Sequence, residues 1–231
     1  MITFLIPTFN EKKNIKILID SINKLKLNFT YDFLFVDDKS NDGTNNELND
    51  AKLKFNNVNY ISRNEDNRDL TQSLVIAINK LKKKYTFILD CDLQHDYKKI
   101  QEFFNIITSE KIDVVIGSRF INNKQSIFLN KRRTFESKIA ILICKLIGIK
   151  KITDPLSGFF LIKTDILSNT KNKITTRGFK ILLTILYKNK NLITFKEVPI
   201  KFNKRKYEKS KLNLRVKLLF LEQIFKLVFR I

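Results

Sequence analysis

Two aspartates separated by one residue are the strongest candidates for chemistry in this sequence. Asp90-Cys91-Asp92 follows the apolar run Tyr85–Leu89, and Gln94 stands two residues further on. Two carboxylates at a strand end, with an amide oxygen beside them, can gather around one hard cation such as Mg²⁺ or Mn²⁺. The alternative is a polar turn in which the aspartates only cap the next segment. Taken alone, the spacing leaves both interpretations open.

Two further acidic turns follow apolar runs nearer the N-terminus. Asp37-Asp38 ends the run Phe33–Val36, and Glu11 lies in the turn after Ile2–Ile6. Each has a local explanation, because Asn, Asp and Gly form turns, Thr44 can cap a helix and a carboxylate favours a helix start. Of the adjacent Asp37 and Asp38, one can face a ribose or base while the other supports the loop. Together the three turns would line one cleft.

The segments between these turns alternate between strand and helix patterns. We expect strands over residues 2–6, 33–36, 58–61, 85–89 and 114–117. We expect helices over residues 15–25 (capped by Asn10), 44–55, 70–81 and 100–107. Such alternation predicts an α/β fold with a mostly parallel sheet and helices on both faces. Ligands of these sheets bind at the carboxyl ends of the strands, where the acidic turns fall.

The pattern loosens after residue 120, as expected for a substrate-side half. We expect a helix over 133–147, an apolar segment over 159–162, a helix over 179–187 and a strand over 195–202. The sequence shows no linker, so residues 1–211 are predicted to form one domain. Residues 212–231 are predicted to form an amphipathic C-terminal helix.

Charges in this C-terminal segment fall on one narrow helical stripe. Arg215, Glu222, Lys226 and Arg230 share it, Lys217 lies outside it, and the remaining arc is Leu, Ile, Val and Phe. Such a helix can lie in the headgroup plane of a membrane, with its cations reaching lipid phosphates. The alternative is a helix that packs on the domain's own core or in a dimer.

Composition limits the classes of partner. The chain has 231 residues, 43% hydrophobic and 29% charged, which excludes a disordered protein, and its formal net charge is +21. A charge of this size attracts nucleic acid, anionic lipid or phosphorylated substrates without choosing among them. Cys91 and Cys144 with the single His95 cannot complete a zinc set, so we expect two reduced thiols. Neither a signal peptide nor a transmembrane run is evident, which predicts an intracellular protein.

Seven segments, in this order, resemble one enzyme family. They are Pro-Thr-Phe-Asn-Glu (7–11), Val-Asp-Asp-Lys-Ser-Asn-Asp-Gly-Thr (36–44), Asp-Cys-Asp-Leu-Gln-His (90–95), Gly-Ser-Arg (117–119), Asp-Pro-Leu-Ser-Gly-Phe-Phe (154–160), Gly-Phe-Lys-Ile-Leu-Leu (178–183) and Ser-Lys-Leu (210–212). Together they resemble the dolichyl-phosphate mannosyltransferases (polyprenol monophosphomannose synthases), inverting glycosyltransferases of family 2 with the Rossmann-like GT-A fold. The first three segments are shared across family 2. The third in its full length, the fifth and the sixth are more particular to enzymes with a lipid-phosphate acceptor.

The resemblance implies a role for each matched residue. Binding of the donor nucleotide-sugar would involve Pro7, Phe9, Glu11, Val36, Asp38, Asp90, Cys91, Asp92, Lys180, Arg205 and Lys211. Mg²⁺ or Mn²⁺ would be held by Asp90, Asp92 and Gln94, and catalysis would depend on Asp92, Arg205 and Lys211. Arg119 and Arg133 resemble basic residues near the acceptor phosphate. Four departures from the family pattern remove no ligand: Phe9 replaces Tyr, Cys91 replaces Ala, Glu208 replaces Gly, and the loop 67–70 lacks a glycine that the family often has there.

The implied reaction moves a hexose, mannose from GDP-mannose, onto a polyprenyl phosphate. A phosphate acceptor is already anionic and needs no general base, so we assign none, and we interpret His95 as structural. The implied enzyme is peripheral on the cytoplasmic side of a membrane, bound to its surface or to a membrane-anchoring partner.

Three alternatives stay open. One is a family 2 transferase with another donor, such as UDP-glucose, or another acceptor. Another is a basic nucleic-acid-binding protein, although no nucleic-acid signature is present and strand-end carboxylates would repel phosphate without a metal. The last is a catalytically silent homologue, which the intact Asp90, Asp92 and Gln94 set argues against.

Overall fold

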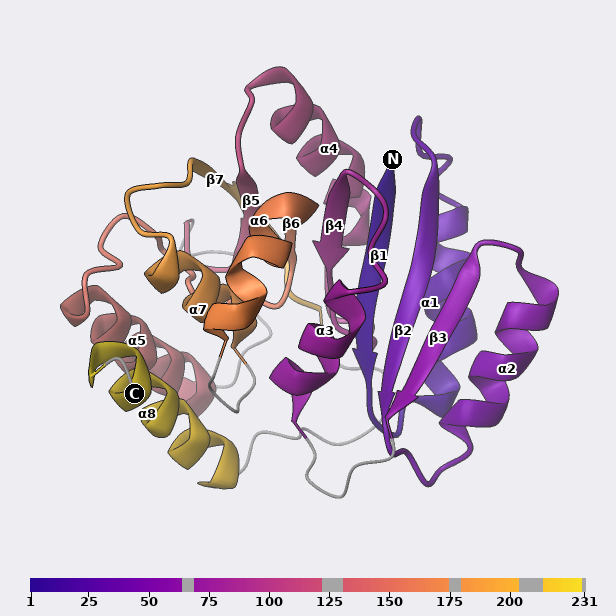
Figure 1. Cartoon of the computed structure of the whole chain (residues 1–231), viewed down its shortest axis with the longest axis horizontal. Helices are drawn as coiled ribbons and strands as arrows, with labels where there is room; N and C mark the ends of the chain where they lie inside the picture. The colour runs from indigo at the N-terminus through magenta and orange to yellow at the C-terminus, as the bar shows by residue number, and fades with distance from the viewer. Residues whose placement is uncertain (64–68, 122–130, 175–179, 204–213, 230–231) are drawn as a thin grey trace.

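The fold is built around one seven-stranded sheet in the order β3-β2-β1-β4-β6-β5-β7 (Figure 1). The computed structural model describes residues 1–63, 69–121, 131–174, 180–203 and 214–229. The strands are β1 (Ile2–Thr8), β2 (Tyr31–Asp38), β3 (Val58–Arg63), β4 (Tyr85–Ile88), β5 (Val114–Ser118), β6 (Phe160–Lys163) and β7 (Phe195–Pro199). Strands β1 to β4 pair in parallel, as do β5 and β7, whereas β6 runs antiparallel to both β4 and β5. The predicted mixed, mostly parallel α/β sheet is therefore confirmed.

Helices cover both faces of this sheet (Figure 1). They are α1 (Lys12–Asn23), α2 (Thr44–Lys54), α3 (Leu70–Ile78), α4 (Ile100–Ser109), α5 (Lys131–Leu146), α6 (Thr164–Thr170), α7 (Ile181–Lys188) and α8 (Leu214–Phe229), with short 3₁₀ turns η1 (Tyr97–Lys99) and η2 (Lys171–Lys173). The buried faces of α1, α2 and α4 form one apolar layer with the sheet. Those of α3, α5, α6, α7 and α8 form a second layer on the opposite face. The inner strands, such as β1, β4 and β5, are thus buried on both sides, which explains their continuous apolar runs.

Local details differ from four expectations. Asn10 does not cap α1: it adopts a left-handed φ of 51°, its side-chain oxygen accepts from Asn41 N, and the cap position belongs to Glu11. Thr44 is the first residue of α2 rather than its cap, because Gly43, at φ 89°, takes that position. Strand β7 ends at Pro199, earlier than expected. Helix α6 has no counterpart in the sequence prediction.

The three acidic turns meet at one edge of the sheet. Strand β1 lies between β2 and β4, and all three run in the same direction. Their carboxyl ends carry Glu11, the Asp37-Asp38 pair and Asp90 with Asp92. The fold therefore brings together residues that are about eighty positions apart in the chain, at the edge where α/β sheets bind ligands.

Candidate active site

The two aspartates after β4 have different environments. Asp92 is 5% exposed, and its Oδ1 accepts a hydrogen bond of 3.1 Å from the backbone N–H of Gln94. Between them, Leu93 has a positive φ of 61°, which tightens the turn. The side chain of Asp90 is 43% exposed. The turn thus anchors one carboxylate and presents the other to solvent.

Asp90 rests in a space that a glycine leaves open. A Cβ atom added at Gly158 would lie 2.8 Å from Asp90 Oδ2, closer than real contacts allow. Gly158 belongs to the segment 154–160, whose Ser157 hydroxyl donates to the carbonyl of Gly117 at 2.7 Å. The absence of a side chain at Gly158 is therefore what lets the Asp90 carboxylate lie against this loop.

His95 contacts the same carboxylate from the other direction. Its Nε2 lies 3.3 Å from Asp90 Oδ2, and its ring stacks on Phe159 with centroids 4.8 Å apart. Phe202 meets the ring edge-on at 5.7 Å. The imidazole is 4% exposed, and its Nδ1 has no hydrogen-bond partner among the described residues. These contacts agree with a structural role, in which His95 orients Asp90.

Gln94 connects this turn to the chain after β7. Its Nε2 donates to the carbonyl of Asn203 at 2.9 Å, and Asn203 N donates to the carbonyl of Gln94 at 2.8 Å. The amide nitrogen of Gln94 is therefore committed to Asn203, and only Oε1 could serve as the predicted metal ligand. Asn203 directly precedes the segment 204–213, so the predicted residues Arg205 and Lys211 lie outside the described residues.

The residues predicted to hold the nucleoside lie along β1 and β2. Pro7 and Val36 are register partners on these neighbouring strands, and Phe9, half-buried, follows β1. Glu11 is 5% exposed, and its Oε2 accepts from Asn14 Nδ2 at 2.6 Å. Pro7, Phe9, Glu11 and Val36 therefore lie together at the carboxyl ends of β1 and β2.

The adjacent aspartates at the end of β2 are both bonded within the protein. Asp37 accepts from the backbone N–H and the hydroxyl of Ser40, which fixes the turn before α2. Asp38 accepts from Arg63 Nη1 at 2.7 Å and from the backbone N–H of Asp69 at 2.8 Å. The structure thus supports the loop-stabilising role for Asp37. A nucleoside at Asp38 would have to share that carboxylate with Arg63.

Arg119, predicted to lie near an acceptor phosphate, forms a bidentate ion pair with Asp154. Its Nε and Nη2 donate to Asp154 at 2.7 and 2.9 Å, and Asp154 is fully buried. Burial alone would lower the pKa of Arg119, but the charge and hydrogen bonds of Asp154 outweigh it and raise the pKa. Arg119 is therefore a fixed cation, stacked over Phe120 and Phe202. Arg133 lies in α5, and its side chain is outside the described residues.

Lys180, more than eighty residues from Asp90 in sequence, reaches the same site. Its Nζ donates to the carbonyl of Leu156 at 3.1 Å. Burial lowers the pKa of Lys180, and the positive charge of Arg119 lowers it further, whereas Asp90 and Asp154 act in the opposite direction. The lysine therefore lies within electrostatic reach of the strand-end carboxylate and of the Arg119–Asp154 pair. The structure thus brings Lys180 near both Asp90 and Arg119.

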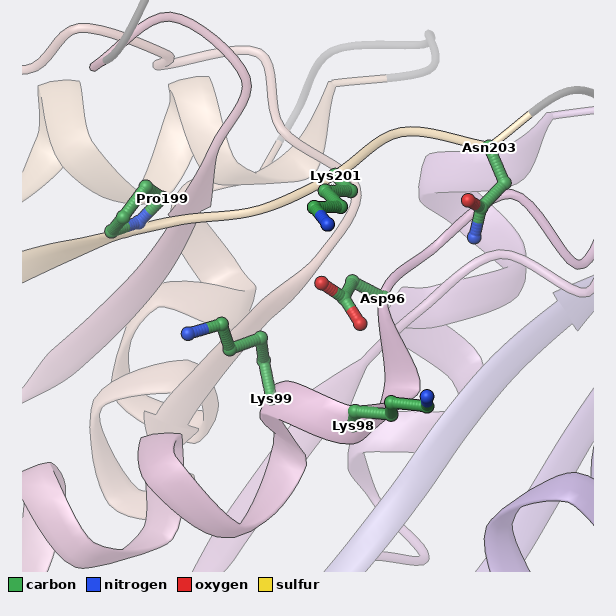
Figure 2. Close-up of a pocket in the computed structure, with 6 residues that line it drawn as sticks. All are labelled: Asp96, Lys98, Lys99, Pro199, Lys201 and Asn203. Carbon is green, nitrogen blue, oxygen red and sulfur yellow. The ribbon is translucent and has the colours of Figure 1, made fainter. Parts of the chain in front are cut away.

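A cavity of about 510 Å³ opens beside this site (Figure 2). It is lined by Asp96, Lys98, Lys99, Pro199, Lys201 and Asn203. Figure 2 shows the Asp96 carboxylate among the three lysine side chains. Of the predicted ligand and nucleoside residues that the structure describes, none lines it, although Asn203 borders both the cavity and the Gln94 turn. The cavity is thus a basic recess next to the site.

Sequence reasoning missed the residues that fix the loop 152–158. Asp154 was noted only as part of a motif, but it holds Arg119. Glu197 on β7 accepts from the backbone N–H groups of Thr153 and Asp154 at 2.9 and 3.0 Å. The charged residue Glu197 within a predicted strand was the available signal. The fixed loop in turn places Gly158 against Asp90.

The side chains around Asp90 and Asp92 suit a divalent cation with few protein ligands. Within the described ranges, no group of three or more His, Cys, Asp or Glu side chains is arranged to hold a metal ion. Mg²⁺ and similar ions are often bound through one or two carboxylates, with waters and substrate phosphates as the other ligands. Asp90 and Asp92, with the Asp90 carboxylate partly exposed to solvent, fit such a low-count site. Cys91, the residue between them, is buried.

The class of protein follows from the order of the strands and from the site: a carboxylate pair follows β4, and Lys180 lies near Asp90. This is the GT-A fold of the nucleotide-sugar-dependent glycosyltransferases, and solved structures with it align over the whole chain. The chain belongs to glycosyl transferase family 2, whose family model matches residues 3–170. The family prediction from the sequence is therefore confirmed.

Similar proteins were found among both curated sequences and solved structures. A dolichol-phosphate mannosyltransferase from Pyrococcus furiosus is 28% identical over 98% of this chain, which spans 63% of that relative's length. The dolichol-phosphate mannosyltransferase of Saccharomyces cerevisiae is 27% identical over 95% of this chain and 84% of its own. Glucosyl-3-phosphoglycerate synthase from Mycobacterium tuberculosis, solved with Mn²⁺, UDP-glucose and glycerol 3-phosphate, aligns with a TM-score of 0.69. That structure is 14% identical and covers all of this chain and 79% of its own, so it supports the fold alone.

Proposed function

We propose that this chain transfers mannose from GDP-mannose to a polyprenyl phosphate of the dolichyl type. The observation that carries this proposal is the position of Asp90, bordered by Gly158 and His95, with Lys180 in electrostatic reach. Carboxylates and a buried cation at one strand end suit a diphosphate that must be both bound and stabilised as it leaves. Two relatives named as dolichol-phosphate mannosyltransferases, similar over nearly the whole chain, support the choice of donor and acceptor.

We propose Mg²⁺ or Mn²⁺ as the cofactor, with Asp90, Asp92 and Gln94 as its protein ligands. A cation bound there would neutralise negative charge that develops on the departing diphosphate. Lys180 adds a second positive charge from the protein, and a hydrogen bond to the carbonyl of Leu156 holds its ammonium in place. A cation held in place before the reaction needs no reorganisation when charge develops.

Acceptor binding is assigned to Arg119. Asp154 uses the Nε and Nη2 groups of this arginine, so an acceptor phosphate would bind through Nη1. The phosphate oxygen attacks C1 of mannose on the side opposite the diphosphate, and no proton has to be removed from it. His95 is not needed as a base, which agrees with its burial against Phe159.

A panel of donors tests this function. GDP-mannose, GDP-glucose, UDP-glucose and UDP-N-acetylglucosamine are each offered with a short-chain polyprenyl phosphate and Mn²⁺ or Mg²⁺. We expect a mannosylated lipid from GDP-mannose and little product from the UDP-sugars. Product from UDP-glucose alone would contradict the donor, and no lipid product from any donor would contradict the acceptor.

We further propose that the enzyme binds a lipid surface through α5 and α8. The two helices lie side by side and are joined by an ion pair of 2.7 Å between Lys217 and Glu136 (Figure 1). Together they expose a set of large apolar side chains, here called the apolar face: Phe135, Ile139, Leu142, Leu146, Leu218, Leu221, Phe225, Val228 and Phe229. On α8 these residues lie opposite Leu227, which packs into the second apolar layer. The sequence left open whether this helix lies on a membrane or packs on the domain's core. In α8 one side packs on the core, and the other side is exposed and could contact lipid.

No helix in the described part of the chain is long and apolar enough to cross a membrane. The apolar face would therefore contact lipid from the surface. Its charged neighbours include the Glu222–Lys226 ion pair, and the net charge of +21 favours anionic lipid.

Placing charges on the apolar face should release the enzyme from lipid. Leu221→Asp combined with Phe225→Asp should weaken binding to vesicles of anionic phospholipid by about 100-fold, because two large apolar side chains lose their burial. Co-sedimentation measures the change. Leu53→Asp is the matched control, since Leu53 is 78% exposed on α2, at the far end of the sheet. Equal sedimentation of the double variant and wild type would contradict the proposed surface.

A further inference from the structure

One polar residue lies on the buried side of α8. Gln223 is 1% exposed, whereas its neighbours on that side, Phe220, Ile224 and Leu227, are apolar and pack against the second apolar layer. A leucine could fill such a position without any polar atom to satisfy. The Oε1 atom of Gln223 has no hydrogen-bond partner among the described residues, so burial of the amide carries a cost. The hydrogen bonds of the side-chain nitrogen, Nε2, explain why this position has an amide.

The amide nitrogen of Gln223 bridges two residues of the neighbouring helix α7. Nε2 donates to the backbone carbonyl of Lys180 at 3.0 Å and to Thr184 Oγ1 at 2.8 Å. Lys180 occupies the N-cap position of α7, and Thr184 is fully buried one turn further on. Gln223 therefore fixes the backbone from which the Lys180 side chain extends.

From that backbone, Lys180 extends toward the candidate active site. Its Nζ donates to the carbonyl of Leu156, in the same loop as Gly158, and its charge interacts with Asp90. A lysine side chain is long and flexible, so the position of its ammonium depends on where its backbone is held. A continuous series of contacts thus runs from α8 through Gln223 and Lys180 to the strand-end carboxylate.

We infer that Gln223 is a positioning residue for Lys180, through which the C-terminal helix shapes the donor-diphosphate site. The inference rests on the proposed function, because it takes Lys180 to bind the diphosphate. The opposite side of α8 carries the apolar face, so one side chain joins the proposed lipid-binding helix to the chemistry. Gln223 itself touches neither donor nor acceptor.

The test replaces Gln223 by methionine, which has a similar shape but no amide. We expect KM for GDP-mannose to rise about fivefold to tenfold, as for one lost hydrogen bond to a functional group, with a smaller change in KM for the polyprenyl phosphate. The same substitution is then made together with Lys180→Met, which removes the ammonium but keeps the backbone carbonyl. If Gln223 acts through Lys180, the double variant should behave like Lys180→Met alone.

Two matched variants separate positioning from packing. Leu227→Met perturbs the same buried side of α8, and Thr184→Val removes the other partner of Gln223 Nε2; both should leave KM for GDP-mannose within about twofold of wild type. A fully additive double variant, or an equal rise in KM for Thr184→Val, would overturn the inference. If Gln223→Met does not fold, Gln223→Leu also removes the amide without adding a charge, and its double variant with Lys180→Met is compared in the same way.

The same data distinguish this inference from the proposed function. If the wild-type chain makes no mannosylated lipid, the proposed function fails before any variant is compared. If wild type is active and Lys180→Met is impaired while Gln223→Met matches wild type, only the positioning role is lost.

Discussion

Asp92→Ala should reduce mannose transfer by about 10²- to 10³-fold or more while leaving the fold intact. The carboxylate is held at the end of β4 by the N–H of Gln94, so it is placed before any ligand arrives. Its proposed partner is the cation that neutralises the leaving diphosphate. Loss of that charge affects the transition state more than the ground state, so kcat should fall more than donor affinity. Initial rates with saturating GDP-mannose measure the effect.

Two further aspartate variants make this result specific. Asp92→Asn keeps an oxygen that can accept from Gln94 N but removes the negative charge, and it should be as inactive as Asp92→Ala. Asp96→Ala changes a carboxylate of the adjacent cavity and should retain most activity. Near-normal rates for Asp92→Asn would show that the charge is not needed, and would remove the metal role.

Gly158→Ala should lower transfer by about 10- to 100-fold, the range for residues that orient metal ligands. The added Cβ would lie 2.8 Å from Asp90 Oδ2, and the nearest atoms it meets all belong to that carboxylate. Because Asp90 can rotate away, the clash displaces the ligand rather than the backbone. The free energy of unfolding should stay level or rise by about 0.4–1 kcal/mol, since alanine restricts the unfolded chain. Activity and chemical denaturation are measured on the same sample.

Gly117→Ala is the comparison variant, and we expect it to lower stability where Gly158→Ala does not. At Gly117 an added Cβ would meet the Phe159 ring at 2.8 Å and the Phe159 backbone oxygen at 3.0 Å, neither of which can move freely. Gly117→Ala should therefore destabilise the fold, by about 1–3 kcal/mol as in other overpacked cores. If Gly158→Ala lost stability as much as Gly117→Ala, the space beside Asp90 would be structural and not functional.

Much of the fold follows from local patterns. Runs such as Ile2–Ile6 and Phe33–Val36 are apolar because their strands are buried on both faces, and short acidic turns mark where they end. These signals lie within a few residues of each other, so the sequence predicts both the parallel sheet and the edge where Asp90 and Asp92 lie. The helix caps were less predictable. Side-chain preferences favour Asn10 and Thr44 as N-caps of α1 and α2, but the N-cap residues are Glu11 and Gly43.

The site's supporting contacts depend on long-range geometry that no local pattern reveals. The Arg119–Asp154 ion pair joins residues 35 positions apart, and Gln223 reaches Lys180 across 43 positions. Gly158 could be identified as part of a motif, but its function as a space for Asp90 needs the loop and β4 side by side. The predictions for Arg205 and Lys211 stay predictions, since both lie in the segment 204–213.

Calorimetric titration of the wild-type chain with GDP, in Mn²⁺ and then in EDTA, tests the central claim most directly. That claim is a cation-dependent diphosphate site at the end of β4. We predict binding in Mn²⁺ that weakens at least about tenfold in EDTA, with no such difference for Asp92→Ala. Equal affinity for GDP with and without the cation, or an unchanged metal dependence in Asp92→Ala, would contradict it.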